Sequence, residues 1–157
     1  MIATETLRSG GNPAGCMKSE FESSWQFFVQ VMNTLHILFD DIEPELSTIG
    51  LEPKGFFLLE LLEENPYPAQ LAKALCLPNP TITFLLKRLE EREYVKRANE
   101  PGDLRKYRFT MTAAGRKALT KGETIVGKSV EQMLSRLSSP DRKTLFKLFG
   151  EMAVSRR

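Results

Sequence analysis

The side chains with the clearest chemistry in this sequence are the cations between Asn79 and Lys117. This stretch of 39 residues holds ten Lys or Arg against five Asp or Glu, whereas residues 1–50 hold two against seven. The net charge of the whole chain, +2, hides the difference. A local basic block is typical of a surface that faces a polyanion, although many ordinary solvated surfaces are also basic. The block therefore predicts a nucleic-acid-binding segment only if the elements around it can present the charges together.

Groups suited to catalysis or metal binding are scarce. The chain has one histidine, His36, and two cysteines, Cys16 and Cys76. These are too few for a metal cluster or for a secreted disulfide framework. The sequence shows no Ser/His/Asp or Cys/His constellation and no glycine-rich phosphate loop. We therefore expect a protein that is not an enzyme and has no cofactor or metal, with His36 and Cys76 packed in the core.

Length and composition indicate one globular domain. The 157 residues match the size of an ordinary domain, and 41% hydrophobic with 27% charged residues is a usual balance. The longest uncharged run, 23–39, contains several polar residues and is shorter than a typical membrane-spanning helix. No secretory signal is recognisable at the N-terminus. We expect a cytoplasmic protein without membrane contact.

Two apolar helices are predicted at the ends of the chain. Residues 1–19 have no apolar period and are expected to form a flexible tail. A seam with alternating spacings of four and three residues follows: Phe21, Trp25, Phe28, Met32, Leu35, Phe39 and Ile42. Pro44 and residues 47–50 are expected to end this helix. The last helix is expected to start at a Ser139 cap and to be apolar at Leu145, Leu148, Phe149 and Met152. A second subunit is expected to cover these faces.

Three shorter helices and a hairpin are predicted between them. Pro53 suits the start of the first, a short helix follows, and Asn79 is expected to cap the third, with Pro80 in its first turn. The apolar residues of this third helix recur at helical spacing: Ile82, Leu85, Leu86 and Leu89. Alternation then predicts strands at 94–98 and 105–111 around a loop at 99–104, and Thr112 should cap the next helix.

This order of elements predicts an α+β fold that is mostly helical, a winged helix-turn-helix with N- and C-terminal dimerisation helices. The exposed face of the third short helix would fit the DNA major groove, where side chains read base edges. The hairpin would form a wing that approaches the adjacent minor groove, whose negative potential attracts Arg.

At these residues the chain resembles the MarR family of winged helix-turn-helix transcriptional regulators. The order and spacing of several short segments carry the resemblance: 70–72, 81–83, 87–90, 95–97, 103–105 and 109–115. It covers about residues 20–155. It implies a homodimer that binds double-stranded DNA at a pseudo-palindromic operator and responds to a small-molecule effector or a redox cue. We expect a repressor that is relieved by a small ligand.

The resemblance also implies roles for individual residues. It assigns DNA contacts to the third short helix and the wing, at Asn79, Thr81, Thr83, Phe84, Lys87, Arg88, Arg105 and Lys106. Asp103 would orient Arg105 in the minor groove. The dimer interface would include Phe21, Trp25, Phe28, Met32, Leu145, Phe149 and Met152. The implied parts of the domain are residues 20–46 and 118–157 for dimerisation and 51–112 for DNA binding.

Three residues depart from the family pattern. Leu104 stands where many relatives have a second Arg. Glu93 stands where a Gly usually closes the recognition helix, so we expect that helix to end differently here. Phe84 occupies a commonly polar position and could contact a thymine methyl group or pack against a neighbouring loop. The alternative function is a winged-helix module that binds protein instead of DNA, and the basic block at 79–117 favours DNA.

Overall fold

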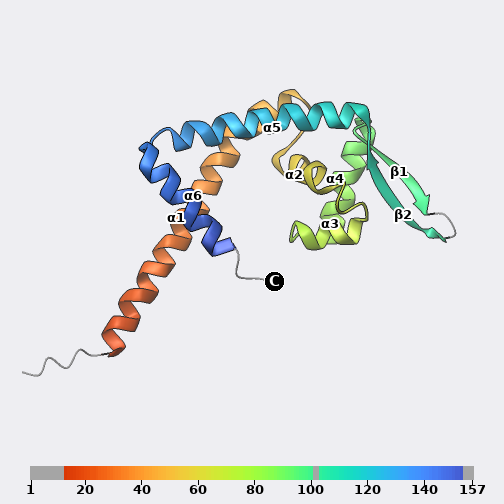
Figure 1. Cartoon of the computed structure of the whole chain (residues 1–157). Helices are drawn as coiled ribbons and strands as arrows, with labels where there is room; N and C mark the ends of the chain where they lie inside the picture. Colours follow the sequence, from red (N-terminus) through yellow and green to blue (C-terminus); the bar gives the residue numbers. More distant parts are fainter. Residues whose placement is uncertain (1–12, 101–102, 154–157) are drawn as a thin grey trace, which may run out of the picture. The chain divides into compact units, whose positions relative to one another are not determined.

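The protein is an assembly of α-helices with one β-hairpin (Figure 1). The computed structural model describes the backbone of residues 13–100 and 103–153 and the side chains of 22–99 and 107–152. Over these ranges the elements follow the order α1 (Pro13–Thr48), α2 (Pro53–Leu61), α3 (Pro68–Ala74), α4 (Asn79–Glu91), β1 (Val95–Glu100), β2 (Asp103–Met111), α5 (Ala113–Leu134) and α6 (Ser139–Ala153). The predicted fold class, mostly helical with a small antiparallel sheet, is confirmed.

The chain divides into two compact units, one ending at Ile37 and the other beginning at Leu38. In the described part of the first unit, α1 is the only element. The second unit contains the end of α1 and all of α2–α6. None of the helices in the described ranges is long and apolar enough to cross a membrane.

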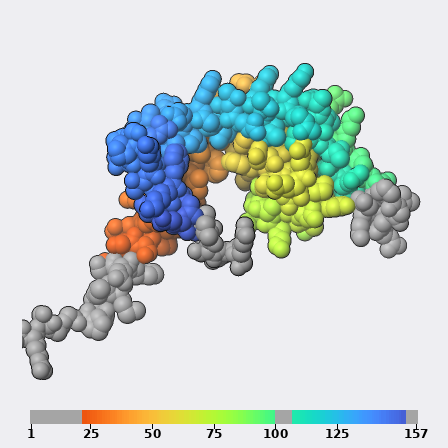
Figure 2. Space-filling view, viewed as in Figure 1, coloured from red at the N-terminus to blue at the C-terminus, as the bar shows by residue number. Residues whose placement is uncertain are grey.

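The core of the second unit forms where the end of α1 meets α2, α3, α4 and the hairpin. Its buried apolar side chains are Ile42, Leu46, Leu51, Phe56, Leu58, Leu59, Leu62, Leu71, Ile82, Leu85, Leu86, Leu89, Val95, Phe109 and Ala118. All four apolar positions predicted for the inner face of α4 belong to this cluster. In Figure 2, α5 lies over the surface formed by α2–α4. Burial of this one cluster therefore fixes α4 and the hairpin against a common support.

Helices α1, α3 and α4 are each followed by a residue in the left-handed conformation, two positions after their last residue. These residues are Gly50 (φ 72°), Cys76 (φ 52°) and Glu93 (φ 59°). Only the first is a glycine, the residue that adopts this conformation without steric cost. The Cys76 side chain is exposed, so the prediction of a buried Cys76 is wrong.

The end of α4 corrects a second expectation. The N–H of Tyr94 donates to the carbonyl of Leu89, and the N–H of Glu93 donates to the carbonyl of Glu90, both over 2.9 Å. This is the Schellman pattern that a glycine usually closes. The helix therefore ends in the usual way with Glu93 in the glycine position, because the paired hydrogen bonds and the packing of the following turn outweigh a conformational cost of about 1 kcal/mol.

The first helix also differs from the prediction. It begins at Pro13, within the predicted tail, because proline suits the first turn of a helix. It continues through Pro44 and ends at Thr48, since a proline removes one hydrogen bond without preventing the next turn. His36 is exposed, so the prediction of a core histidine is wrong. In the described first unit, α1 has no second element to cover it.

Two helix starts lie one residue earlier than predicted. The N-cap of α4 is Pro78, and Asn79 already belongs to the helix. At α6 the Ser138 hydroxyl accepts a hydrogen bond from the Asp141 N–H over 3.3 Å, so Ser138 caps the helix instead of Ser139. The predicted Thr112 cap of α5 is confirmed, because its hydroxyl accepts from the Gly115 N–H over 3.0 Å.

The hairpin is longer than predicted. Its strands extend to Glu100 and Asp103, so the connection is shorter than the expected loop at 99–104. The register places Val95 opposite Met111 and Arg97 opposite Phe109, with an irregularity after Asn99. The strands pair regularly from Val95 and Met111 as far as Asn99 and Tyr107, and one further pair, Glu100 with Asp103, follows the irregularity, so the base of the wing is the regularly paired part.

Candidate nucleic-acid interface

Helices α3 and α4 form the two helices of a helix-turn-helix. The turn between them is fixed by the left-handed Cys76 and by the Leu77 N–H, which donates to the Ala72 carbonyl over 3.0 Å. Pro78 then sets an extended residue immediately before α4. Because the apolar side of α4 is buried in the core, its opposite side must face outward.

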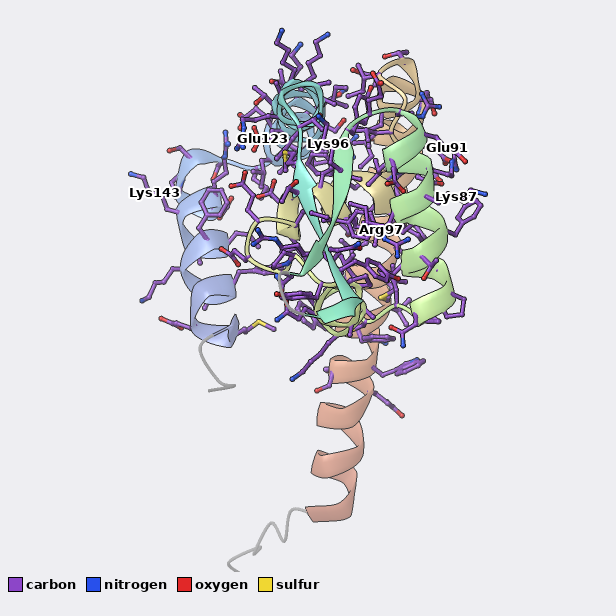
Figure 3. All side chains as sticks on the ribbon, turned by 90° about the vertical axis from the view of Figure 1, so that its right-hand side faces the viewer. Lys87, Glu91, Lys96, Arg97, Glu123 and Lys143 are labelled. Carbon is purple, nitrogen blue, oxygen red and sulfur yellow. The ribbon has the colours of Figure 1, made fainter. Side chains whose placement is uncertain are left out.

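The outward face of α4 combines apolar, polar and charged groups. Asn79, Thr83, Phe84 and Lys87 are exposed, and Thr81 is half-buried. Lys87 forms an exposed ion pair with Glu91, with 3.9 Å between Nζ and Oε1. Figure 3 shows both on the outer side of α4. The Thr83 hydroxyl donates to the carbonyl of Asn79 over 3.0 Å, which leaves its oxygen free to accept from a ligand.

Phe84 is the most exposed apolar group of this face, with 57% of its surface accessible. Of the two interpretations open from the sequence, packing against a neighbouring loop is therefore wrong. Its neighbour is Arg88, whose guanidinium carbon lies 5.6 Å from the ring centroid. This distance is within the range of a cation–π contact.

Arg88 is held by an ion pair that the sequence does not reveal. Its Nη1 donates to Oε1 of Glu52 over 3.0 Å, and the side chains are 43% and 34% exposed. Glu52 is the residue immediately before α2, 36 positions away in the chain. The contact becomes visible only when α2 and α4 pack together, since no local spacing relates the two residues.

The hairpin presents cations on both of its faces. Lys96 and Arg108 lie on the outer face, and both are exposed. Arg97 lies on the other face, with its guanidinium carbon 3.8 Å from the ring centroid of Tyr107. Figure 3 shows Lys96 and Arg97 on the hairpin beside α4. The strand alternation could have identified these three cations as candidate DNA contacts, but the sequence prediction concentrated on the wing tip.

The base of the wing is attached to the helical lobe by several hydrogen bonds. The Phe109 N–H donates to the carbonyl of Pro66 over 2.8 Å, in the connection between α2 and α3. The Thr112 hydroxyl, just after β2, donates to the carbonyl of Glu93 over 2.6 Å. The Tyr94 hydroxyl donates to the carbonyl of Ile49 over 2.7 Å. These bonds fix the hairpin relative to α4, so the two elements can present a common surface.

Comparison with known proteins identifies the domain. Residues 51–107, from the start of the α2 segment into the wing, match the sequence model of the MarR family. The part of the chain that holds α2, α3, α4 and most of the hairpin is thus similar to the MarR family. The resemblance inferred from the sequence is thereby confirmed, and with it the prediction of a regulator instead of an enzyme.

Curated relatives of the chain include two mycobacterial proteins. They are the HTH-type transcriptional repressors Rv2887 of Mycobacterium tuberculosis and Mb2911 of Mycobacterium bovis. Each is 25% identical over 118 residues, which cover 74% of this chain and 85% of the relative.

Solved MarR-family structures share the fold. The reduced form of MarR from E. coli has a TM-score of 0.72 at 20% identity and covers 78% of this chain and 93% of that one. The S. aureus MepR–DNA complex has a TM-score of 0.67 at 19% identity, with coverages of 84% and 98%. M. tuberculosis Rv2887 in complex with salicylic acid has a TM-score of 0.66 at 23% identity, with coverages of 78% and 93%.

Some predicted site residues lie outside the described side chains. Asp103, Arg105 and Lys106 belong to β2 by their backbone, but their side chains are not described, and neither is that of Phe21. Their roles remain predictions. Of the described residues, no group of three or more His, Cys, Asp or Glu could hold a metal ion.

Each of the two units exposes apolar side chains that were predicted for the dimer interface. In the first unit, Trp25, Phe28 and Met32 are exposed, and the rings of Trp25 and Phe28 are 5.5 Å apart. In the second unit, Phe149 and Met152 of α6 are exposed, whereas Leu145 is half-buried. Large apolar surfaces of this kind are typical of interfaces.

Proposed function

We propose that this protein is a homodimeric transcriptional repressor that binds double-stranded DNA. The observation that carries the proposal is the pairing of an outward polar face on α4 with an adjacent hairpin that exposes Lys96, Arg97 and Arg108. The α4 face suits the major groove, and the cations suit the phosphates and the neighbouring minor groove. The MepR–DNA complex and the repressor names of the mycobacterial relatives support this function.

The DNA-binding lobe corresponds to residues 51–112. In this proposal the contacts to DNA come from Asn79, Thr81, Thr83, Phe84, Lys87 and Arg88 on α4, and from Arg105 and Lys106 on the wing. Asp103 orients Arg105. The polar and cationic groups position the protein on phosphates, while the α4 side chains that reach base edges supply the specificity.

Dimerisation is assigned to residues 20–46 and 118–157. The exposed apolar side chains of each unit are covered by a second copy of the chain, and the two-fold symmetry of that dimer matches a pseudo-palindromic operator. Residues 1–19 are the predicted tail, although α1 already begins within them, at Pro13. A small ligand relieves repression, an assignment supported by the salicylic acid complex of Rv2887. The protein acts in the cytoplasm.

The dimer is tested by replacing two exposed seam residues with acids, in the double variant Trp25→Asp with Met32→Asp. Sedimentation of the wild type at micromolar concentration should give a dimer, and the double variant should be monomeric or aggregated. The control is Gln26→Asp with Asn33→Asp, which adds the same charge to exposed polar positions of α1 and should leave the dimer intact. A wild type that sediments as a stable monomer contradicts the proposal.

DNA binding is tested by incubating the protein with fragmented DNA from its own genome and sequencing the retained fragments. The proposal predicts enrichment of a few sites with inverted symmetry. Retention without any preferred sequence would indicate non-specific binding. No retention at low salt would favour the alternative, a winged-helix module that binds protein.

A further inference from the structure

Three side chains, Glu52 just before α2 and Phe84 and Arg88 on α4, lie next to one another at the surface of the lobe formed by α2–α4. Glu52 accepts a hydrogen bond from Arg88 over 3.0 Å, and the Arg88 guanidinium carbon lies 5.6 Å from the centre of the Phe84 ring. Phe84 and Arg88 are four residues apart in α4, so their side chains share one side of the helix. Arg88 thus contacts a carboxylate and an aromatic ring at the same time.

This arrangement engages Arg88 within the protein. One of its nitrogens, Nη1, already donates to Glu52, and its side chain is 43% exposed. Arginine reads guanine through two parallel donors aimed at O6 and N7, so a guanine contact would have to use the remaining donors of Arg88. The bond to Glu52 limits how far Arg88 can turn toward a base and keeps the guanidinium beside the Phe84 ring.

Phe84 presents an apolar ring, 57% exposed and beside the Arg88 guanidinium, on the face that the proposed function directs at DNA. Lys87 on the same helix and Lys96 on the wing are exposed cations, and both suit phosphates. Charge complementarity thus favours DNA as the occupant of this face. Of the groups on base edges in the major groove, the apolar one is the C5 methyl of thymine.

We propose that Phe84 reads a thymine methyl group in each half-site and that Arg88, held by Glu52, is a positioning residue for its ring instead of a guanine-reading residue. This inference rests on the proposed function and names the base feature that α4 recognises. It assigns recognition to an aromatic ring at a position that is commonly polar in the family.

The test uses a duplex that the wild-type protein selects from a random pool. Each thymine is replaced in turn by deoxyuridine, which removes only the methyl group, and the dissociation constant is measured by fluorescence anisotropy. For wild type, deoxyuridine at the recognised thymine of one half-site should lower the affinity about fourfold, because the burial of one methyl group is lost. Replacing the equivalent thymines of both half-sites together should lower it about fifteenfold. Phe84→Ala should bind more weakly and be insensitive to deoxyuridine at that position. Phe84→Leu, which keeps an apolar side chain, should retain part of the sensitivity.

The role of Arg88 is tested on the same duplex. Arg88→Ala and Glu52→Gln should each reduce the ratio of deoxyuridine to thymine dissociation constants toward one. A merely structural role would weaken binding to both duplexes equally and leave the ratio unchanged. Replacing guanines by 7-deazaguanine removes the N7 acceptor. If Arg88 positions the ring, wild type and Arg88→Ala should respond to 7-deazaguanine alike.

The outcomes separate this inference from the proposed function. Tight, selective binding that is insensitive to deoxyuridine at every thymine would overturn the inference and leave DNA binding intact. A 7-deazaguanine effect that disappears in Arg88→Ala would assign Arg88 to guanine and overturn its positioning role. If no duplex is selected at all, the proposed function fails, and the inference fails with it.

Discussion

Gly122 in α5 packs against the ring of Phe56 in α2 so closely that a Cβ at this position would overlap the ring. Gly115 lies about two helical turns earlier in α5 and makes a similarly close contact, because a Cβ there would overlap the carbonyl oxygen of Tyr94. These two contacts let α5 lie directly on the DNA-binding lobe. The absence of side chains at both positions thus determines where α5 crosses the core.

Gly122→Ala should destabilise the protein by about 1–3 kcal/mol, because the buried Phe56 ring must shift to admit the new methyl group. Urea unfolding at fixed protein concentration measures the change. The matched control is Gly127→Ala in the same helix, where no atom lies within 4 Å of the new Cβ. This variant should gain up to about 1 kcal/mol from helix propensity. Equal losses in both variants would contradict the close packing of α5 on α2.

Glu93→Gly should stabilise the protein by about 1 kcal/mol, because glycine adopts the left-handed conformation at the end of α4 without steric cost. The matched control, Glu90→Gly, removes a similar charge from the interior of the same helix and should cost about 1 kcal/mol. Thermal unfolding of both variants measures the difference in sign. A Glu93→Gly variant as unstable as Glu90→Gly would show that α4 ends differently.

The connection between α5 and α6 should be sensitive to acid. Arg142 donates hydrogen bonds of 2.9 and 2.7 Å to the two carboxylate oxygens of Glu131, and this pairing holds the pKa of Glu131 below its ordinary value. The ionised carboxylate therefore contributes stability at neutral pH, present above the unfolded pKa of about 4.5 and lost as the pH falls through the lower folded pKa. Arg142 stays protonated throughout this range.

Glu131→Gln should accordingly lower the unfolding midpoint slightly at pH 7, and its difference from wild type should shrink as the pH falls below about 4.5. The control is Glu151→Gln on α6, which removes an exposed carboxylate 3.8 Å from Lys147. Its effect at pH 7 should be smaller, because it removes a single exposed ion pair instead of two parallel hydrogen bonds. A Glu131→Gln effect that persists unchanged at pH 3 would argue against the ion pair as its cause.

The sequence predicted those parts of the fold in which local pattern and tertiary packing agree. Ile82, Leu85, Leu86 and Leu89 recur at helical spacing, and all four are buried. The cap at Thr112 was equally readable, because a hydroxyl before a helix satisfies its first free N–H groups. Such features depend on neighbouring residues alone.

The parts that the sequence could not predict depend on residues far apart in the chain. The pairing of Glu52 with Arg88 requires α2 to pack on α4, and no periodic pattern signals it. Cys76 lies between the apolar residues Leu75 and Leu77, which suggested burial, but it stands in a left-handed turn before α4 and is exposed. In both cases the tertiary context decides what the local sequence leaves open.

Arg105→Ala should weaken DNA binding at least tenfold without changing the dimer, because it removes a cation that the wing is expected to insert into the minor groove. The slope of log affinity against log salt should fall by about one to two, since a dimer loses two charges. Asp103→Ala should weaken binding less and leave the slope nearly unchanged. The control is Arg136→Ala, which removes an exposed arginine in the turn after α5, outside the proposed DNA interface. This variant should bind DNA like wild type. If Arg105→Ala also binds like wild type with the same slope, the wing is not a DNA contact.

The most direct test of the central claim is the salt dependence of wild-type binding to the selected duplex, with a scrambled duplex as reference. If α4 and the cationic wing bind DNA, the affinity for the selected duplex should fall by about two orders of magnitude or more between roughly 50 and 200 mM salt. It should also exceed the affinity for the scrambled duplex by about a thousandfold or more. Binding that is weak, insensitive to salt and equal for the two duplexes would contradict the assignment of this surface to DNA.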